Sequence, residues 1–167
     1  TLNGMGVVRF TSAQSLDITS SNDFSTVIVV MNQASGQSAE TKPLGSNIFA
    51  TTSAGKFGMK RQGSAWMDSG ISSHSPALIT MQLHPGNYAF YVNGTNKGSG
   101  TDPVAPTSAT KVGNDFAGDI AELIAYNTAL SEGVRHKVEG YLAHKWGLAG
   151  SLPSTHTYKV GKPAFGG

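Results

Sequence analysis

Residues 118–148, GDIAELIAYNTALSEGVRHKVEGYLAHKWGL, change their hydrophobic period once and thereby decide the fold. Residues 120–126, IAELIAY, are apolar except for Glu122 and predict a strand. Ser131 is then a candidate N-cap, and Glu132 places an acidic side chain in the first turn of a helix. Apolar side chains recur at spacings of three and four at Val134, Val138, Tyr141, Leu142 and Trp146. We therefore predict one amphipathic helix from Glu132 to Trp146, closed by Gly147, near the C-terminal end of a β-rich chain.

A long motif runs through this stretch, with the pattern G-x-I-A-E-x-I-x-Y-N-x-A-L-S followed by Y-L-A-x-K-W-G-L. Its residues are Gly118, Ile120, Ala121, Glu122, Ile124, Tyr126, Asn127, Ala129, Leu130, Ser131, Tyr141, Leu142, Ala143, Lys145, Trp146, Gly147 and Leu148. Further matches are Val8-Arg9-Phe10, Phe90-Tyr91-Val92-Asn93-Gly94 and the tail residues Leu152, Pro153, His156 and Tyr158. Together they resemble the laminin G-like, concanavalin A-like domains of bacterial surface proteins and phage particles. The resemblance covers nearly the whole chain and implies a β-sandwich used for extracellular recognition or adhesion.

Composition agrees with an all-β domain. The 167 residues suit one domain, only 13% of them are charged, and 21 are glycine. Strands are predicted at residues 7–10, 25–32, 47–51, 56–60, 77–83, 88–92, 95–99 and 110–113. Asn93-Gly94 predicts a tight hairpin, and residues 98–110, with two prolines, predict the longest loop. We expect a single laminin G-like domain over residues 1–167, a two-sheet antiparallel β-sandwich (concanavalin A-like jelly roll) with one C-terminal helix.

One departure from the resemblance concerns the first strand segment. Many laminin G-like relatives carry a W-x-D-x-S-G-N segment before the V-R-F strand, and nothing like it precedes Arg9 here. An uncovered edge strand exposes unpaired backbone groups, so we expect the edge near residues 7–10 to be completed by upstream sequence or by a second subunit. The alternative is an edge protected by Lys, Pro or a bulge. On the first interpretation the domain is part of a larger chain or an oligomer.

Charge and hydropathy exclude two classes of partner. The net charge is only +2, and the 12 Lys and Arg residues are scattered without a run of three, whereas phosphate tracking needs a basic stripe. We therefore predict no nucleic-acid partner. No apolar segment approaches the roughly 18 residues of a membrane-spanning helix, so we predict no membrane insertion. The absence of cysteine removes disulfides and thiolate metal sites.

The best candidates for acid and base catalysis are Asp119 and Glu122, with Asp115 nearby. A retaining glycosidase needs two carboxyl groups about 5 Å apart. The separation of three positions along a strand places Asp119 and Glu122 on opposite faces, so we expect them to have structural roles. No G-x-S-x-G nucleophile motif and no phosphate-binding glycine loop is present. We predict that the protein is not an enzyme.

Metal ligands form no clear set. The five histidines show neither H-x-x-x-H nor H-x-H; His136 and His144 are too far apart on the helix to share an ion, and His156 is expected to pack against the helix. The resemblance raises calcium, for which the candidates are Asp68, Asp102, Asn114 and Asp115. They are spread over three loops without a D-x-D-x-D-G series, so a turn-forming role is favoured. We predict no metal and no cofactor.

Aromatic side chains offer the ligand-binding candidates. Tyr91 alternates with Phe90 and Val92 and is expected to face away from the core, and Trp66 lies in a polar segment, although core packing of Trp66 is an equally favoured interpretation. Phe57 is a further aromatic candidate. Exposed aromatic groups beside Asp and Asn are typical of a lectin-like site. The predicted ligand-binding residues are Trp66, Asp68, Tyr91, Asn114 and Asp115.

The sequence leaves three functions open. The first is a non-enzymatic surface module that binds a glycan or docks on a surface protein, within a larger extracellular or virion assembly. The second is a purely structural phage virion protein, decorating the capsid or associated with the tail, without a glycan ligand. A polysaccharide-active enzyme is the third. The expected location is extracellular, at a cell surface or on a virion.

Overall fold

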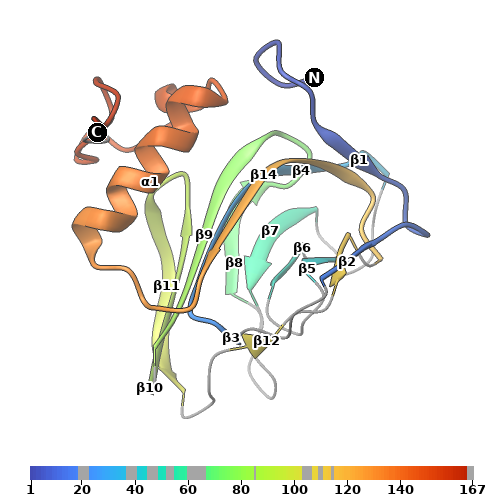
Figure 1. The fold of residues 1–167 in the computed structure, drawn as a ribbon, viewed down its shortest axis with the longest axis horizontal. Helices are drawn as coiled ribbons and strands as arrows, with labels where there is room; N and C mark the ends of the chain where they lie inside the picture. The colour runs from blue at the N-terminus through green and yellow to red at the C-terminus, as the bar shows by residue number, and fades with distance from the viewer. Residues whose placement is uncertain are drawn as a thin grey trace.

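The computed structural model describes residues 1–18, 23–36, 41–44, 49–51, 55–59, 67–84, 86–102, 107–108, 111–113 and 115–164 (Figure 1). Within them, antiparallel strands form two six-stranded sheets and one short two-stranded sheet. The first sheet has the order β1 (Val8–Phe10), β14 (Gly118–Tyr126), β4 (Thr26–Gln33), β9 (Ala77–His84), β10 (Gly86–Val92) and β11 (Thr95–Asp102). The second has the order β2 (Leu16–Asp17), β13 (Lys111–Val112), β5 (Thr41–Leu44), β6 (Phe49–Thr51), β7 (Lys56–Met59) and β8 (Met67–Ser72). In the short sheet β12 (Thr107–Ser108) pairs with β3 (Asp23–Phe24).

The two large sheets stack face to face, so the predicted β-sandwich is confirmed. Alternate residues of β4, among them Val27, Val29 and Met31, point into the space between the sheets. There they meet Phe57 and Met59 of β7, together with side chains of β9, β10 and β14. Phe57 is buried in this core, which corrects its prediction as a ligand-binding candidate. Burial of each such side chain contributes about 1.5–3 kcal/mol to the stability of the sandwich.

A third layer covers the outer face of the first sheet. Helix α1 (Glu132–Lys145) lies there, followed by the short 3₁₀ turn η1 (Ala149–Ser151) and the C-terminal tail (Figure 1). The alternate residues of β4 that point away from the sandwich, Ile28 and Val30, pack against Leu142 and Trp146 of this layer. Among the described residues, no helix has the length and apolar character needed to cross a membrane.

The predicted helix is confirmed, but its buried face differs from the prediction. Ser131 is the N-cap without a side-chain capping hydrogen bond, and Gly147 has a φ of 75° while the Leu148 N–H bonds to the Ala143 carbonyl, which closes the helix. Val134 is 46% exposed and does not belong to the apolar stripe. Its place on the buried face is taken by two charged residues, Arg135 and Glu139.

Most predicted strands are present, and the Asn93-Gly94 hairpin has the positive φ angles of 50° and 73° that it requires. Five described strands were not predicted, namely the two-residue strands β2, β3 and β12 and the longer strands β5 and β8. β5 contains Pro43 and β8 reads MDSGIS, and both sequences resemble turns more than strands. The predicted loop over residues 98–110 is wrong in its first part, because β11 continues to Asp102.

Strand β1 lies at the edge of the first sheet. It pairs with β14, with Val8 opposite Ile120, and no other described strand pairs with it. Val8 is 50% exposed at this edge. The expectation that another polypeptide segment completes the edge remains a prediction.

Candidate functional site

A pocket of about 450 Å³ opens between the first half of α1, the β10–β11 hairpin and the tail after η1. Its lining is mostly polar and comprises Gln82, Tyr91, Gly94, Asn96, Glu132, Arg135, His136, Pro153, Thr155 and His156. These residues come from segments far apart in the sequence. The pocket therefore exists only because α1 and the tail fold back onto the outer face of the sheet.

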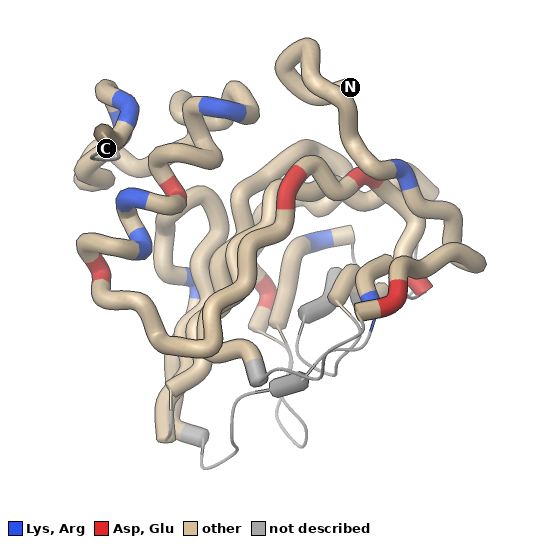
Figure 2. The backbone as a smooth tube through the Cα atoms, viewed as in Figure 1, with Lys and Arg blue, Asp and Glu red and all other residues tan. Residues whose placement is uncertain are grey.

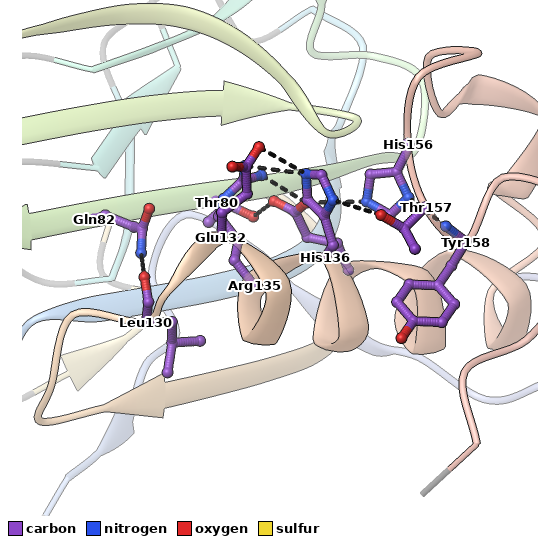
Figure 3. Close-up of polar contacts among 10 residues, drawn as sticks. Thr80, Gln82, Leu130, Glu132, Arg135, His136, His156, Thr157 and Tyr158 are labelled. Carbon is purple, nitrogen blue, oxygen red and sulfur yellow. Dashed lines mark hydrogen bonds and ion pairs between the residues drawn. The ribbon is translucent and has the colours of Figure 1, made fainter.

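The base of the pocket is a buried polar network centred on Glu139, whose partners Thr80, Arg135 and His156 are labelled in Figure 3. Glu139 follows Arg135 by four positions, so both side chains leave the same face of α1 toward the sheet. Glu139 Oε1 accepts a 2.7 Å hydrogen bond from Thr80 Oγ1 of β9. Its Oε2 accepts one of 2.8 Å from Arg135 Nη1 and one of 3.2 Å from His156 Nε2. A buried carboxylate is thus paired and fully hydrogen-bonded.

The tail brings His156 into this network. His144 Nε2 donates a 3.0 Å hydrogen bond to the Tyr158 carbonyl, which anchors the tail on α1. The Tyr158 N–H donates to His156 Nδ1 at 3.2 Å, so the ring proton must be on Nε2, from which it is donated to Glu139. This fixes one neutral tautomer of His156.

His136 is held in the opposite tautomer. Arg135 Nη2 can only donate, and it lies 3.2 Å from His136 Nε2, so Nε2 accepts. The ring proton is then on Nδ1, which donates to Thr157 Oγ1 at 3.1 Å. The rings of His136 and His156 lie against each other with centroids 4.3 Å apart and planes tilted by 35°.

These contacts shift two pKa values. Burial of Glu139 acts to raise the pKa of its carboxyl group, but the hydrogen bonds from His156, Thr80 and Arg135 and the charge of Arg135 outweigh it and hold this pKa below its ordinary value. Burial lowers the pKa of His136, and the charge of Arg135 lowers it further. At neutral pH Glu139 is therefore ionised and His136 is neutral.

His136, Glu139 and His156 also raise the question of a metal, since their ligand atoms all lie within 4.8 Å of one another. The hydrogen bonds that these residues already make do not fit metal binding. His156 Nε2 carries a proton toward Glu139, and the Arg135 guanidinium already supplies the positive charge that Glu139 requires. This trio was not predicted from the sequence. The available signal was H-x-x-E at residues 136–139, which places His136 and Glu139 on one helical face, whereas no spacing rule places His156 beside them.

Tyr91 is the described ligand-binding candidate that lines the pocket. It pairs with Thr80 across β9 and β10 and so faces α1, away from the core between the sheets, as its alternation with Phe90 and Val92 predicted. The Arg135 guanidinium carbon lies 3.9 Å from the centroid of the Tyr91 ring. One face of the ring is thus covered by a cation–π contact, and only the remaining surface is open to a ligand.

Two other described candidates, Asp68 and Asp115, are not among the residues that line this pocket. Asp68 is exposed on β8, and its Oδ1 accepts a 2.7 Å hydrogen bond from the Gly70 N–H. Asp115 is exposed in a turn with a φ of 55°. Both arrangements match the turn-forming role considered for them. Trp66 and Asn114 lie outside the described residues, as does the side chain of Asp102.

Asp119 and Glu122 lie on the same face of β14, which corrects the prediction of opposite faces. A β-bulge between Ile120 and Glu122 shifts the register, so Asp119 pairs with Asn32 and Glu122 with Val30, both on the outer side of β4. Each carboxylate has its own partner.

For Asp119 the partner is Arg9, whose Nε lies 2.7 Å away; this hydrogen bond lowers the Asp119 pKa. Glu122 Oε2 accepts a 2.7 Å hydrogen bond from Trp146 Nε1 and lies 2.8 Å from Lys145 Nζ. Both carboxylates are therefore committed to structural contacts. Lys and Arg residues are scattered among Asp and Glu residues over the described part of the chain, and Figure 2 shows no continuous basic stripe.

No protein-family model and no curated protein sequence matches this chain. Solved structures share its fold. Domain 4 of AbnA, a GH43 extracellular arabinanase from Geobacillus stearothermophilus, in complex with arabinotriose, is 18% identical over 78% of this chain and 75% of that chain, with a TM-score of 0.56. The CBM40 of the Ruminococcus gnavus IT-sialidase, bound to alpha2,3 sialyllactose, is 10% identical over 78% and 94%, with a TM-score of 0.57. A heptameric SAP-like pentraxin from Limulus polyphemus is 14% identical over 74% and 76%, with a TM-score of 0.53.

Proposed function

We propose that this chain is a non-enzymatic glycan-binding module and that its ligand binds in the pocket between α1, the β10–β11 hairpin and the tail. The observation that carries this proposal is the pocket itself, an open hollow of about 450 Å³ with a largely polar lining and a partly exposed tyrosine. Sugars present hydroxyl groups and flat C–H faces, and such a lining complements both.

The structural neighbours support a sugar ligand, since two of them were solved with arabinotriose and with sialyllactose bound. Their low identity to this chain transfers the fold and not the binding residues. The proposal extends to a location outside the cell, at a cell or virion surface, within a larger chain or assembly. Asp119 and Glu122 support the non-enzymatic part of the proposal, because each carboxylate is already bound to a basic side chain, Arg9 and Lys145 respectively.

A glycan array with purified protein tests the proposal. Thr155→Val removes an exposed hydroxyl from the pocket, and Tyr91→Phe removes the phenol hydroxyl while it keeps the ring beneath Arg135. We expect at least one array glycan to bind the wild-type protein, and these variants to weaken its binding about fivefold or more, because each lost hydrogen bond is worth about 1 kcal/mol. Unchanged melting temperatures would show that the variants fold.

A comparison variant locates the ligand. Asp68→Ala changes an exposed candidate outside the pocket and should bind like the wild-type protein. Loss of binding in Asp68→Ala or Trp66→Ala, with the pocket variants unaffected, would move the site to the loops predicted from the sequence. Binding to no glycan at all would overturn the proposal and favour the purely structural virion role.

A further inference from the structure

We propose that the pocket accepts uncharged glycans and rejects carboxylated or sulfated ones, and that Glu132 is the residue that sets this preference. The inference rests on the proposed function and names its ligand class. Two observations support the inference. A ligand can reach some charged groups of the pocket and not others, and the neutral polar groups around them have a fixed orientation.

The positive charge of the pocket is not available to a ligand. Arg135 is the cationic lining residue, and its side chain is 5% exposed. Its guanidinium is bonded to Glu139 at 2.8 Å, donates to His136 at 3.2 Å and lies against the Tyr91 ring. Its Nε has no hydrogen-bond partner among the described residues but is buried. The guanidinium charge is thus compensated by Glu139, and the bidentate geometry that carboxylates prefer is not presented to a ligand.

The negative charge of the pocket is available. Glu132 lines the mouth with a side chain that is 79% exposed. It lies 4.0 Å from Arg135 Nη2 and 3.8 Å from His136 Nε2. The single guanidinium thus faces two carboxylates, those of Glu132 and Glu139, while both histidines are held in neutral tautomers by their neighbours. An anionic ligand entering the mouth would therefore meet uncompensated negative charge.

The neutral polar side chains of the pocket, Gln82 and Asn96, favour a ligand with hydroxyl groups. Gln82 Nε2 donates to the Leu130 carbonyl at 2.7 Å, which fixes its Oε1 as an acceptor (Figure 3). Asn96 Oδ1 accepts from the Gly98 N–H at 2.9 Å, which leaves its Nδ2 as a donor. In the described part of the chain, neither remaining atom has a partner. A sugar hydroxyl both donates and accepts and can satisfy such a pair, whereas a carboxylate only accepts and is repelled by Gln82 Oε1 and Glu132.

The test compares neutral and acidic oligosaccharides of matched size. Calorimetric titrations use galactotriose and arabinotriose against trigalacturonate and sialyllactose, with the wild-type protein at 50 and 500 mM NaCl. We expect a neutral sugar to bind at least about tenfold more tightly than the acidic ones, since one unit charge held about 5 Å away in a partly screened site is worth a factor of this order. The Kd of the neutral sugar should change less than about twofold with salt, because exposed ion pairs are what salt screens.

Two variants assign the preference to Glu132. Glu132→Gln keeps the size of the side chain and removes its charge. We expect it to improve the binding of acidic sugars, so that the ratio of the acidic-sugar Kd to the neutral-sugar Kd falls at least threefold. Asp17→Asn makes the same charge change at an exposed position outside the pocket and should leave the discrimination unchanged.

The outcomes separate the two proposals. Tighter binding of trigalacturonate or sialyllactose, a steep loss of affinity with salt, or unchanged discrimination in Glu132→Gln would overturn this inference while leaving a glycan-binding module in place. Binding of none of the four sugars, together with an array on which no glycan binds, would overturn both.

Discussion

Thr80 Oγ1, on the outer face of β9, donates a 2.7 Å hydrogen bond to Glu139 Oε1 at the centre of α1, and both residues are buried. The bond joins the middle of the sheet to the middle of the helix, 59 positions apart in sequence. Arg135 and His156 occupy the other oxygen of the same carboxylate. One carboxylate therefore ties together the sheet, the helix and the tail that form the walls of the pocket.

Replacement of Glu139 should destabilise the fold strongly. Glu139→Ala leaves the buried Arg135 guanidinium without its counter-charge, and removal of one partner of a buried ion pair costs about 3–5 kcal/mol. We expect a loss of this size in the free energy of unfolding, measured by urea denaturation. The matched control is Glu132→Ala on the exposed side of the same helix, which should change stability by no more than about 1 kcal/mol, the value of an acidic side chain in the first turn. Equal effects of the two variants would contradict the structural role of Glu139.

The period of the apolar residues predicted helix α1 almost to the residue, because Val138, Leu142 and Trp146 recur as a buried stripe requires. The same period placed one side of the buried stripe wrongly. Val134 was assigned to the buried face, which instead contains Arg135 and Glu139. A hydrophobic pattern treats charged residues as exposed, and nothing local in the sequence shows that Thr80 and His156 arrive to satisfy them.

The candidate site was predictable only in part, for the same reason. The orientation of Tyr91 follows from the two-residue period of a strand, and the structure agrees with it. The faces of Asp119 and Glu122 follow from the same rule and were predicted wrongly, because one extra residue in β14 shifts the alternation. A bulge depends on pairing with a second strand, so the sequence of one strand does not reveal it.

Stability should fall as the pH is lowered below about 6.5. The pKa of His136 is lowered by burial and by Arg135, so the unfolded chain binds this proton more readily than the folded protein does. The loss begins near the unfolded-state pKa of 6.5 and grows until the folded-state value is passed. The pKa of Glu139 is also lowered; its contribution is present above the unfolded value of 4.5 and is lost as the pH falls further.

Melting temperatures between pH 2.5 and pH 8 measure this effect. His136→Gln should flatten the decline between pH 6.5 and pH 5 and leave the steeper acid limb, which depends on Glu139, in place. A melting temperature that rises on acidification through this range would show that the sign is wrong.

The two glycines of α1 should respond in opposite ways to alanine. A Cβ at Gly133 would meet nothing within 4 Å, so Gly133→Ala should stabilise the protein by about 0.5 kcal/mol through helix propensity. A Cβ at Gly140 would collide with the Cβ of Tyr158, where the tail packs on the helix. Gly140→Ala should therefore destabilise the protein by about 1–3 kcal/mol, as overpacking does. Denaturation curves of the two variants measure the contrast, and stabilisation by both would mean that the tail does not pack closely on Gly140 in solution.

The protein should release no reducing ends from laminarin, agarose, carrageenan or alginate. Each of the two carboxylates of β14, Asp119 and Glu122, already has a partner in the protein. The hydrogen bond from Arg9 lowers the pKa of Asp119, so Asp119 is ionised and has no proton to donate at neutral pH. Glu122 Oε2 is held between Trp146 Nε1 and Lys145 Nζ, and the hydrogen bond to Glu122 raises the pKa of Lys145. A general acid needs a retained proton and a nucleophile needs an open approach, and these contacts provide neither. A reducing-end assay with each polysaccharide checks the expectation; hydrolysis by the wild-type protein that disappears in Glu122→Gln, with the melting temperature preserved, would show that the chain is an enzyme after all.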